Sequence, residues 1–273
     1  MVAVLDFGSQ YTHLITRRIR GLGVKAEIFD HSVDRKTLEK YHIKGIILSG
    51  GPSSVYKKNS PRIKKDILEL NVPILGICYG CQLLAYILKG LVKSGKTREY
   101  GEEIITIKKN YTIFQGLNKK EQVWFSHGDT IKKLPSGFEV LATTKNAPIA
   151  AYANLDKNIY GVQFHPEVVH TPKGNKILKN FLFKICHAKK TWKIDDIKND
   201  LIKNLKDEIG DRKVILGVSG GVDSTVAAQL LHRVIEDNLH CVFIDTGLLR
   251  KNEGNEVSGF FEKLGFKNYR ELP

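Results

Sequence analysis

Long apolar segments are absent from this sequence. No run approaches the ~20 apolar residues that a membrane-spanning helix needs, and no basic stretch precedes the apolar segment at residues 2–5, as it would in a secretory signal. The sequence therefore predicts a protein without a membrane span, located in the cytoplasm.

Cysteine is also scarce, with four residues in 273. Their uneven spacing does not suggest a disulfide framework, and reduced thiols fit a cytoplasmic location. Cys78 and Cys81 form a C-x-x-C pattern, which occurs in redox pairs and in zinc sites. The histidines that would complete a zinc site, His165 and His170, lie far along the chain, so we expect no structural metal. A redox pair and a buried structural thiol remain open.

Acidic residues are fewer than basic ones, 29 against 43, which gives a net charge of +14. Such a charge is compatible with a nucleic-acid-binding protein. The lysines, however, come in scattered pairs, with no basic run that alternates with aromatic residues. This pattern favours solvated surfaces over a nucleic-acid site, and the positive field favours an anionic small-molecule substrate.

One stretch, residues 72–84, carries the strongest chemical signal and reads VPILGICYGCQLL. Four apolar residues lead into a glycine-flanked cysteine, and a helical apolar pattern follows, so Cys78 is expected where a strand turns sharply into a helix. This is the pattern of a nucleophile elbow with sulfur in place of oxygen. The turn strains the cysteine and crowds Gly76 and Gly80, which lack a β-carbon. The helix N-terminus favours the thiolate form.

Strands and helices alternate up to residue 88 at a spacing that predicts an α/β fold with a doubly wound, mostly parallel sheet. In such sheets the site lies beyond the carboxyl ends of the strands. A glycine pair, Gly50-Gly51, follows the strand before the elbow strand. We expect the N–H groups of Gly51 and Tyr79 to form an oxyanion hole. A merely flexible turn is the alternative for the glycine pair.

Short strands are expected from residue 101 onward, at 103–108, 111–114, 123–126, 138–144, 149–153 and 159–164. The last of them runs into His165-Pro166-Glu167. A histidine that is oriented by a carboxylate is the base that a cysteine nucleophile requires, which predicts a catalytic set of Cys78, His165 and Glu167. Taken alone, the His-x-Glu pair would also fit a solvated loop.

A second unit begins after a basic linker. The expected domains are residues 1–188 and 195–273, joined by residues 189–194. A strand at 213–218 leads into a loop of glycines and hydroxyls that opens a helix, an arrangement that holds phosphate. It is not a Walker loop, because the lysine is missing. The predicted ATP-binding residues are Ser219, Gly220, Gly221, Val222, Asp223, Ser224 and Thr225, with Asp223 and Asp245 as candidate Mg²⁺ ligands.

Several motifs in residues 1–188 resemble the class I glutamine amidotransferase family: LDFGSQY at 5–11, ILSGGPSSV at 47–55, LGICYGCQLLA at 75–85, SHGD at 126–129 and YGVQFHPEV at 160–168. The resemblance implies that Cys78 attacks the carboxamide of glutamine while His165 moves protons. It also implies that Gln82 helps to bind glutamine.

The second unit resembles the PP-loop ATP pyrophosphatase family, which has an adenine nucleotide alpha hydrolase-like fold, through SGGVDST at 219–225 and FIDTGLLRKNE at 243–253. The fusion resembles ligases of purine nucleotide biosynthesis. In them, ATP with Mg²⁺ adenylates xanthosine monophosphate (XMP), and ammonia from glutamine displaces AMP. Alternatives are an amidotransferase for another acceptor and a PP-loop RNA-modifying protein.

The resemblance also carries an expectation about the C-terminal part of the chain. The remainder of the pyrophosphatase domain and a dimerisation domain are expected beyond Pro273 in that family. On this basis the second domain is expected to be incomplete, and the 273-residue chain to act at most as a glutaminase. The homodimer expected of the full-length family is not expected of this chain.

Overall fold

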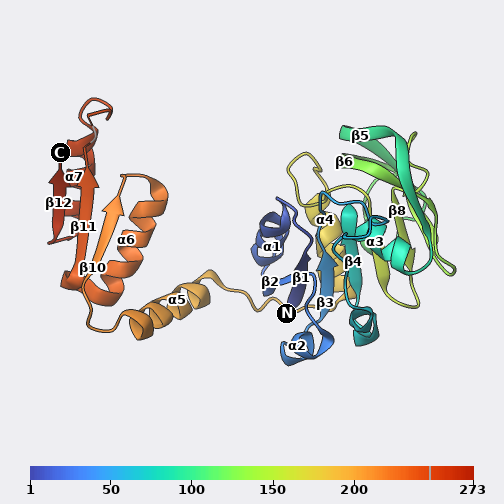
Figure 1. Cartoon of the computed structure of the whole chain (residues 1–273), viewed down its shortest axis with the longest axis horizontal. Coiled ribbons are helices and arrows are strands. Elements are labelled where there is room, and N and C mark those ends of the chain that lie inside the picture. Colours follow the sequence, from blue (N-terminus) through green and yellow to red (C-terminus); the bar gives the residue numbers. More distant parts are fainter. Residues whose placement is uncertain (246) are drawn as a thin grey trace. The chain divides into compact units, whose positions relative to one another are not determined.

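The computed structural model describes residues 1–245 and 247–273, without the side chains of residues 96–99, 194–197 and 200. Thr246, within the FIDTGLLRKNE motif, lies outside the described residues. The chain divides into two compact units, Met1–Trp192 and Lys193–Pro273 (Figure 1). No helix in the described part of the chain is long and apolar enough to cross a membrane.

The first unit is built on one large mixed sheet, as the sequence predicts. Among the described residues its strand order is β2-β1-β3-β4-β9-β8-β7-β5-β6. The first five of these are parallel neighbours: β2 (Ala26–Asp30), β1 (Val2–Asp6), β3 (Gly45–Leu48), β4 (Ile74–Ile77) and β9 (Ile159–Val162). The others pair antiparallel: β8 (Ala151–Asn154), β7 (Glu139–Thr143), β5 (Leu91–Ile107) and β6 (Lys120–Lys133).

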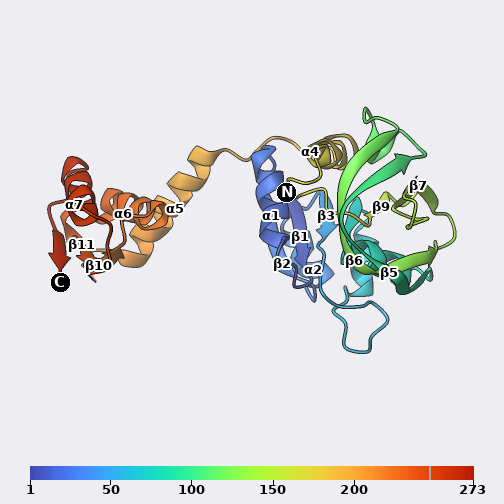
Figure 2. The same ribbon diagram turned by 90° about the horizontal axis from the view of Figure 1, so that it is seen from above.

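Helices cover both faces of the parallel part of the sheet, so alternate residues of β1 pack into two different cores. Val2 and Val4 pack with α1 (Thr12–Gly21), α4 (Gly174–Lys179) and the π-helix η3 (Asn180–Ile185). On the opposite face Ala3 and Leu5 pack with α2 (Arg35–Lys40), the 3₁₀ helix η1 (Lys65–Leu70) and α3 (Tyr79–Ile87). Figure 2 shows this layering beside the curved antiparallel strands. Burial on both faces explains the continuous apolar runs of β3 and β4.

Two local predictions in the antiparallel half are wrong. Residues 111–114, expected as a strand, contain the 3₁₀ helix η2 (Thr112–Phe114), in which Ile113 and Phe114 are buried. The buried Asn180 amide binds the main-chain oxygens of Ile113 and Gln115, so these carbonyls are satisfied without a strand neighbour. The strands β5 and β6 are much longer than the short strands expected at 103–108 and 123–126, because they pair with each other over most of their length.

The second unit contains a parallel sheet in the order β10-β11-β12, among the described residues. Its strands are β10 (Val214–Val218), β11 (Leu239–Ile244) and β12 (Tyr269–Leu272), and its helices are α5 (Ile194–Ile209), α6 (Val222–Ile235), η4 (Glu236–Asn238) and α7 (Glu253–Lys263). Leu239, Cys241 and Phe243 form the core with Ala228 of α6 and Phe261 of α7. Both helices therefore pack against the same face, as right-handed crossovers require.

Candidate active site

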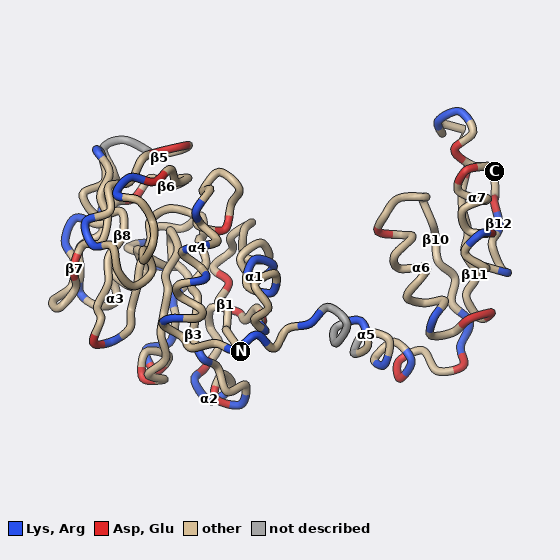
Figure 3. Tube along the Cα trace, turned by 180° about the vertical axis from the view of Figure 1, so that it is seen from behind, with Lys and Arg blue, Asp and Glu red and all other residues tan. Residues whose placement is uncertain are grey.

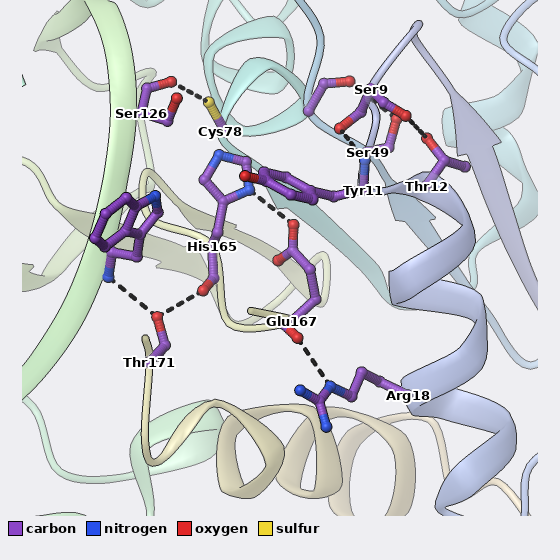
Figure 4. Close-up of polar contacts among 12 residues, drawn as sticks. Ser9, Tyr11, Thr12, Arg18, Ser49, Cys78, Ser126, His165, Glu167 and Thr171 are labelled. Carbon is purple, nitrogen blue, oxygen red and sulfur yellow. Dashed lines mark hydrogen bonds and ion pairs between the residues drawn. The ribbon is translucent and has the colours of Figure 1, made fainter. Parts of the chain in front are cut away.

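Cys78 occupies the junction between β4 and α3, where the sequence predicts a strained turn. Its φ of 50° and ψ of −105° are unusual for a residue with a side chain. The N–H of Cys78 donates to the carbonyl of Val162 in β9 at 2.9 Å, which holds the turn on the sheet edge. The thiol donates to the carbonyl of Ser126 in β6 at 3.6 Å (Figure 4).

The two flanking glycines are required by close contact. A β-carbon on Gly76 would lie 2.6 Å from the main-chain nitrogen of Cys81, and one on Gly80 would lie 2.5 Å from the carbonyl oxygen of Leu48. Both distances are too short for real atoms. The start of α3 can therefore approach β3 and β4 only with glycine at these positions, as the elbow pattern predicts.

His165 and Glu167 lie in the segment that follows β9 and form a buried pair. Nδ1 of His165 lies 2.7 Å from Oε1 of Glu167 (Figure 4), and the two residues are 3% and 0% exposed. Burial lowers the pKa of His165, but hydrogen bonds to Cys78 and Glu167 and their negative charges outweigh it and raise the pKa well above its ordinary value. The imidazole is thus placed to carry a proton between the thiol and a substrate.

A cavity of about 660 Å³ lies over the elbow. The predicted site residues of the first unit that line it are Gly51, Cys78, Tyr79, Gln82 and His165. The Tyr79 N–H belongs to the first turn of α3, where helical N–H groups have no partner within the helix. The arrangement can present a nucleophile, a base and main-chain donors to one carbonyl group.

The predicted glutamine-binding residue Gln82 is buried at the wall of this cavity. Its amide nitrogen donates to the carbonyl of Asp129 at 3.0 Å and to Oε1 of Gln163 at 3.2 Å. These bonds fix the side chain and connect the elbow helix to β6. The direct contact of Gln82 with a substrate stays a prediction.

Sequence reasoning missed several residues that support the base. The ring of Tyr11 contacts the His165 imidazole edge-on, with centroids 5.2 Å apart. Arg18 Nε donates to the carbonyl of Glu167 at 2.8 Å, and the hydroxyl of Thr171 donates to the carbonyl of His165 at 2.6 Å. Tyr11 lies in a motif that the sequence analysis recognised without giving it a role. The contacts of Arg18 and Thr171 have no signal in residue spacing.

In the second unit, the predicted phosphate loop connects β10 to α6. The Ser224 hydroxyl accepts from the N–H of Ser219 at 3.2 Å and donates to the carbonyl of Gly221 at 3.1 Å, which closes the turn. Gly220 has a φ of +72°, and a β-carbon there would lie 2.5 Å from Val257. The loop opens a 14-residue helix, whose N-terminal N–H groups can hold an anion.

The two candidate Mg²⁺ ligands lie at the carboxyl ends of adjacent parallel strands. Asp223 is in the first turn of α6, and Asp245 follows β11, with its Oδ1 accepting from the N–H of Gly247 at 2.8 Å. Among the described residues, no three or more His, Cys, Asp or Glu side chains lie together in a group that could hold a metal ion. Two carboxylates fit Mg²⁺ bound mainly by substrate phosphates and water.

Family comparisons agree with this geometry. Residues 3–185 match the family described as glutamine amidotransferase class-I, and residues 194–271 match the NAD synthase family. Over 263 residues the chain is 49% identical to the GMP synthase [glutamine-hydrolyzing] of Clostridium tetani, and over 266 residues it is 51% identical to that of Thermosipho melanesiensis. These matches cover 96% and 97% of this chain but 52% of each relative. The chain thus spans about half the length of these relatives.

Two solved structures are also similar to this chain. A Thermoplasma acidophilum protein, proposed to be one of the subunits of a GMP synthase, is 33% identical, with a TM-score of 0.60 over 68% of this chain and 93% of its own. A glutamine amidotransferase from Thermotoga maritima, at 20% identity and a TM-score of 0.51, shares the fold; this match covers 86% of this chain and 97% of its own. Cys78 and His165 line one cavity, and residues 3–185 match the family model, so the chain belongs to the class I glutamine amidotransferase family.

Proposed function

We propose that the first unit hydrolyses glutamine to glutamate and ammonia. His165 takes the thiol proton as the Sγ of Cys78 attacks the carboxamide carbon, and the C–N bond breaks as His165 passes this proton to the departing ammonia. Water, deprotonated by His165, then attacks the resulting thioester and releases glutamate. Glu167 holds Nδ1 throughout, which leaves Nε2 of His165 for these proton transfers. The observation that carries the proposal is the buried His165–Glu167 pair beside a strained elbow cysteine.

The negative charge that develops on the carboxamide oxygen needs donors near the elbow. The N–H of Tyr79 and the N–H of Gly51 are our candidates, since both residues line the cavity with Cys78. A β-carbon on the neighbouring Gly50 would lie 3.2 Å from the imidazole of His165 and 3.7 Å from the β-carbon of Cys78. This close approach supports a role for the loop after β3 at the reacting carbonyl.

For the protein as a whole we propose the amination of XMP to GMP. In this proposal residues 219–225 of the second unit bind the phosphates of ATP, and Asp223 and Asp245 would hold the Mg²⁺ that accompanies them. The bound Mg²⁺ would neutralise phosphate charge. The identity of about 50% with GMP synthases across both units supports this assignment. A cytoplasmic location is a further part of the proposal, whereas the homodimer expected of the full-length family is not proposed for this chain.

The test separates the two half-reactions. The protein that carries this sequence is supplied with XMP, ATP, Mg²⁺ and either glutamine or an ammonium salt, and GMP is measured. Cys78→Ser should lose the glutamine-dependent reaction and keep the ammonium-dependent one. Loss of both reactions in a folded variant, or retention of both, would contradict the proposed route of ammonia.

Two alternatives make different predictions. An amidotransferase for another acceptor would release glutamate from glutamine but would form no GMP from XMP. An RNA-modifying protein would bind RNA with a steep dependence on salt. Figure 3 shows lysine and arginine interspersed with acidic residues along both units, a distribution that favours the small-molecule acceptor.

A further inference from the structure

We propose that Thr171 is a positioning residue that fixes the main chain of His165, and through it the distance from the imidazole to Cys78. The inference rests on the proposed glutaminase function and adds a residue to it. Thr171 follows the catalytic histidine by six positions, in the turn between β9 and α4. It does not contact the cavity over the elbow in the described structure, so it acts through His165.

Three hydrogen bonds form a closed circuit around the base. The N–H of His165 donates to the carbonyl of Trp124 in β6 at 2.9 Å. The carbonyl of His165 accepts from the hydroxyl of Thr171 at 2.6 Å, and the same hydroxyl accepts from the N–H of Trp124 at 3.0 Å. One hydroxyl therefore uses its donor and an acceptor position to join the histidine main chain to a neighbouring strand.

The turn that carries Thr171 is itself tightly closed. The N–H of Thr171 donates to the carbonyl of Val168 at 3.2 Å, and the N–H of Gly174 donates to the carbonyl of Thr171 at 2.9 Å. Gly174 packs so closely on Pro166 that a β-carbon would lie 1.8 Å from the Pro166 oxygen. Thr171 is 3% exposed, so bulk water has little access to its hydroxyl.

Nucleophile and base are anchored by different contacts. Cys78 is held at the end of β4 through Val162, whereas the main chain of His165 is held to β6 through Trp124 and Thr171. The contact with Glu167 sets the orientation of the ring but not the position of the His165 main chain. Without the Thr171 hydroxyl, the His165 carbonyl and the Trp124 N–H lose their partner, and the main chain of the base is held by one bond to Trp124 instead of a circuit.

The test compares substitutions that separate the hydroxyl from its packing. Thr171→Val keeps the shape and removes the hydroxyl, and Thr171→Ser keeps the hydroxyl. A displacement of the base by about 1 Å costs on the order of 10²-fold in rate, so we expect Thr171→Val to lower kcat for glutamine hydrolysis by up to this factor with little change in KM. Thr171→Ser should keep most of the kcat of the unmodified protein.

A matched control is available at Thr144, whose hydroxyl accepts from the N–H groups of Asn146 and Ala147 at 3.2 and 2.7 Å. The described residues that line the cavity do not include Thr144. Thr144→Val therefore removes another hydroxyl that joins two main-chain groups, and its kcat should equal that of the unmodified protein. An equal loss of kcat in Thr144→Val and Thr171→Val would overturn the proposal.

The second measurement needs no glutamine and so separates this inference from the proposed function. Iodoacetamide reacts with a cysteine that has given up its thiol proton, and His165 is the group placed to accept the proton of Cys78. We expect Cys78 in folded Thr171→Val to be alkylated more slowly at one fixed pH, with the rates of Thr171→Ser and Thr144→Val unchanged. A native alkylation rate in Thr171→Val would contradict the proposal even if glutamine proved not to be the substrate. If Thr171→Val does not fold, Thr171→Ser decides, since a tenfold loss there would refute the role of the hydroxyl.

Discussion

Cys78 and Cys81, three residues apart in the chain, lie in separate cores on opposite faces of the sheet. Cys78 packs with Val2, Val4 and the α1 side, whereas Cys81 packs with Ala3, Leu5 and the α3 side. Burial raises the pKa of Cys81 well above its usual range. All four cysteines are free thiols. Of the two cysteines of the C-x-x-C pattern, Cys78 lines the cavity, and Cys81 is not among its described lining residues.

The first prediction follows from this separation. A glutamine analogue that alkylates thiols should modify Cys78 and leave Cys81 unmodified, because Cys81 is fully buried and holds its proton. Peptide mapping by mass spectrometry identifies the modified residue. Cys78→Ser should abolish labelling, and Cys81→Ala, as the control, should keep it. Labelling of Cys81 in the native protein would refute the assignment of the nucleophile.

The second prediction compares how much His165 and Glu167 each contribute to the rate of glutamine hydrolysis. His165→Ala removes the proton carrier, whereas Glu167→Gln keeps the size of the side chain and removes the charge that orients the ring. We expect both to slow glutamine hydrolysis, the histidine variant more. The carboxylate-to-amide change in a serine-protease triad costs about 10⁴-fold, which sets the scale for Glu167→Gln. A histidine variant with native turnover would mean that Cys78 uses another base.

The third prediction is a dependence of stability on pH. Against the opposing effect of burial, hydrogen bonds to Cys78 and to Glu167 raise the folded-state pKa of His165. The share that comes from Glu167 therefore stabilises the folded state fully below the ordinary histidine pKa of about 6.5. The stabilisation is lost as the pH rises through the raised pKa. The difference in free energy of unfolding between the native protein and Glu167→Gln should therefore shrink as the pH rises above ~6.5. Urea titrations at several pH values measure it, and a difference that grows with pH would contradict the assignment.

Sequence patterns predicted those parts of the site that depend on local structure. The elbow around Cys78 is specified by apolar residues and two glycines within one short stretch, and Glu167 reaches His165 from two residues away. The support from Thr171 and from the Ser126 carbonyl comes from main-chain contacts between segments far apart in sequence. Every residue type has a main chain, so such contacts leave no compositional signal.

In the fold, too, features set by local sequence were predictable and features set by distant contacts were not. The parallel half was predictable because fully buried strands read as continuous apolar runs between helices. In the antiparallel half, β5 and β6 are long because they pair with each other. Polar residues within both strands interrupt the apolar pattern, so the sequence does not reveal their full length. Residues 111–114 have the apolar content of a strand, but they contain the 3₁₀ helix η2, whose neighbouring carbonyls are bound by the distant Asn180. Local propensity was overridden there by tertiary contacts.

The fourth prediction tests the phosphate loop independently of the first unit. Asp223→Ala removes a carboxylate from the first turn of α6, and we expect it to abolish binding of ATP with Mg²⁺ in calorimetry while glutamine hydrolysis stays intact. Asp237→Ala is the control, because Asp237 is an exposed acid of the same unit that pairs with Lys267 at 2.8 Å. Unchanged ATP affinity in the Asp223 variant would show that its carboxylate is not needed for nucleotide binding.

The last prediction concerns Gly80, whose N–H donates to the carbonyl of Ser49 at 3.1 Å. A β-carbon at this position would lie 2.5 Å from the oxygen, 2.6 Å from the β-carbon and 2.8 Å from the carbonyl carbon of Leu48. Two of these atoms are main chain and cannot rotate away, so α3 or β3 must shift. Overpacking of this kind typically costs about 1–3 kcal/mol, and a shift of β3 would also displace the loop that carries Gly51.

Gly80→Ala should therefore lower both the free energy of unfolding and the rate of glutamine hydrolysis. Gly21→Ala is the matched control, since a β-carbon on this last residue of α1 meets nothing within 4 Å. It should leave the rate unchanged and stabilise the protein by about 0.5–1 kcal/mol, because alanine loses less conformational entropy than glycine on folding. Urea unfolding and glutamate release, measured on the same preparations, give both quantities. Native stability and rate in Gly80→Ala would mean that the elbow tolerates a side chain there and that the contact with Leu48 does not shape the site.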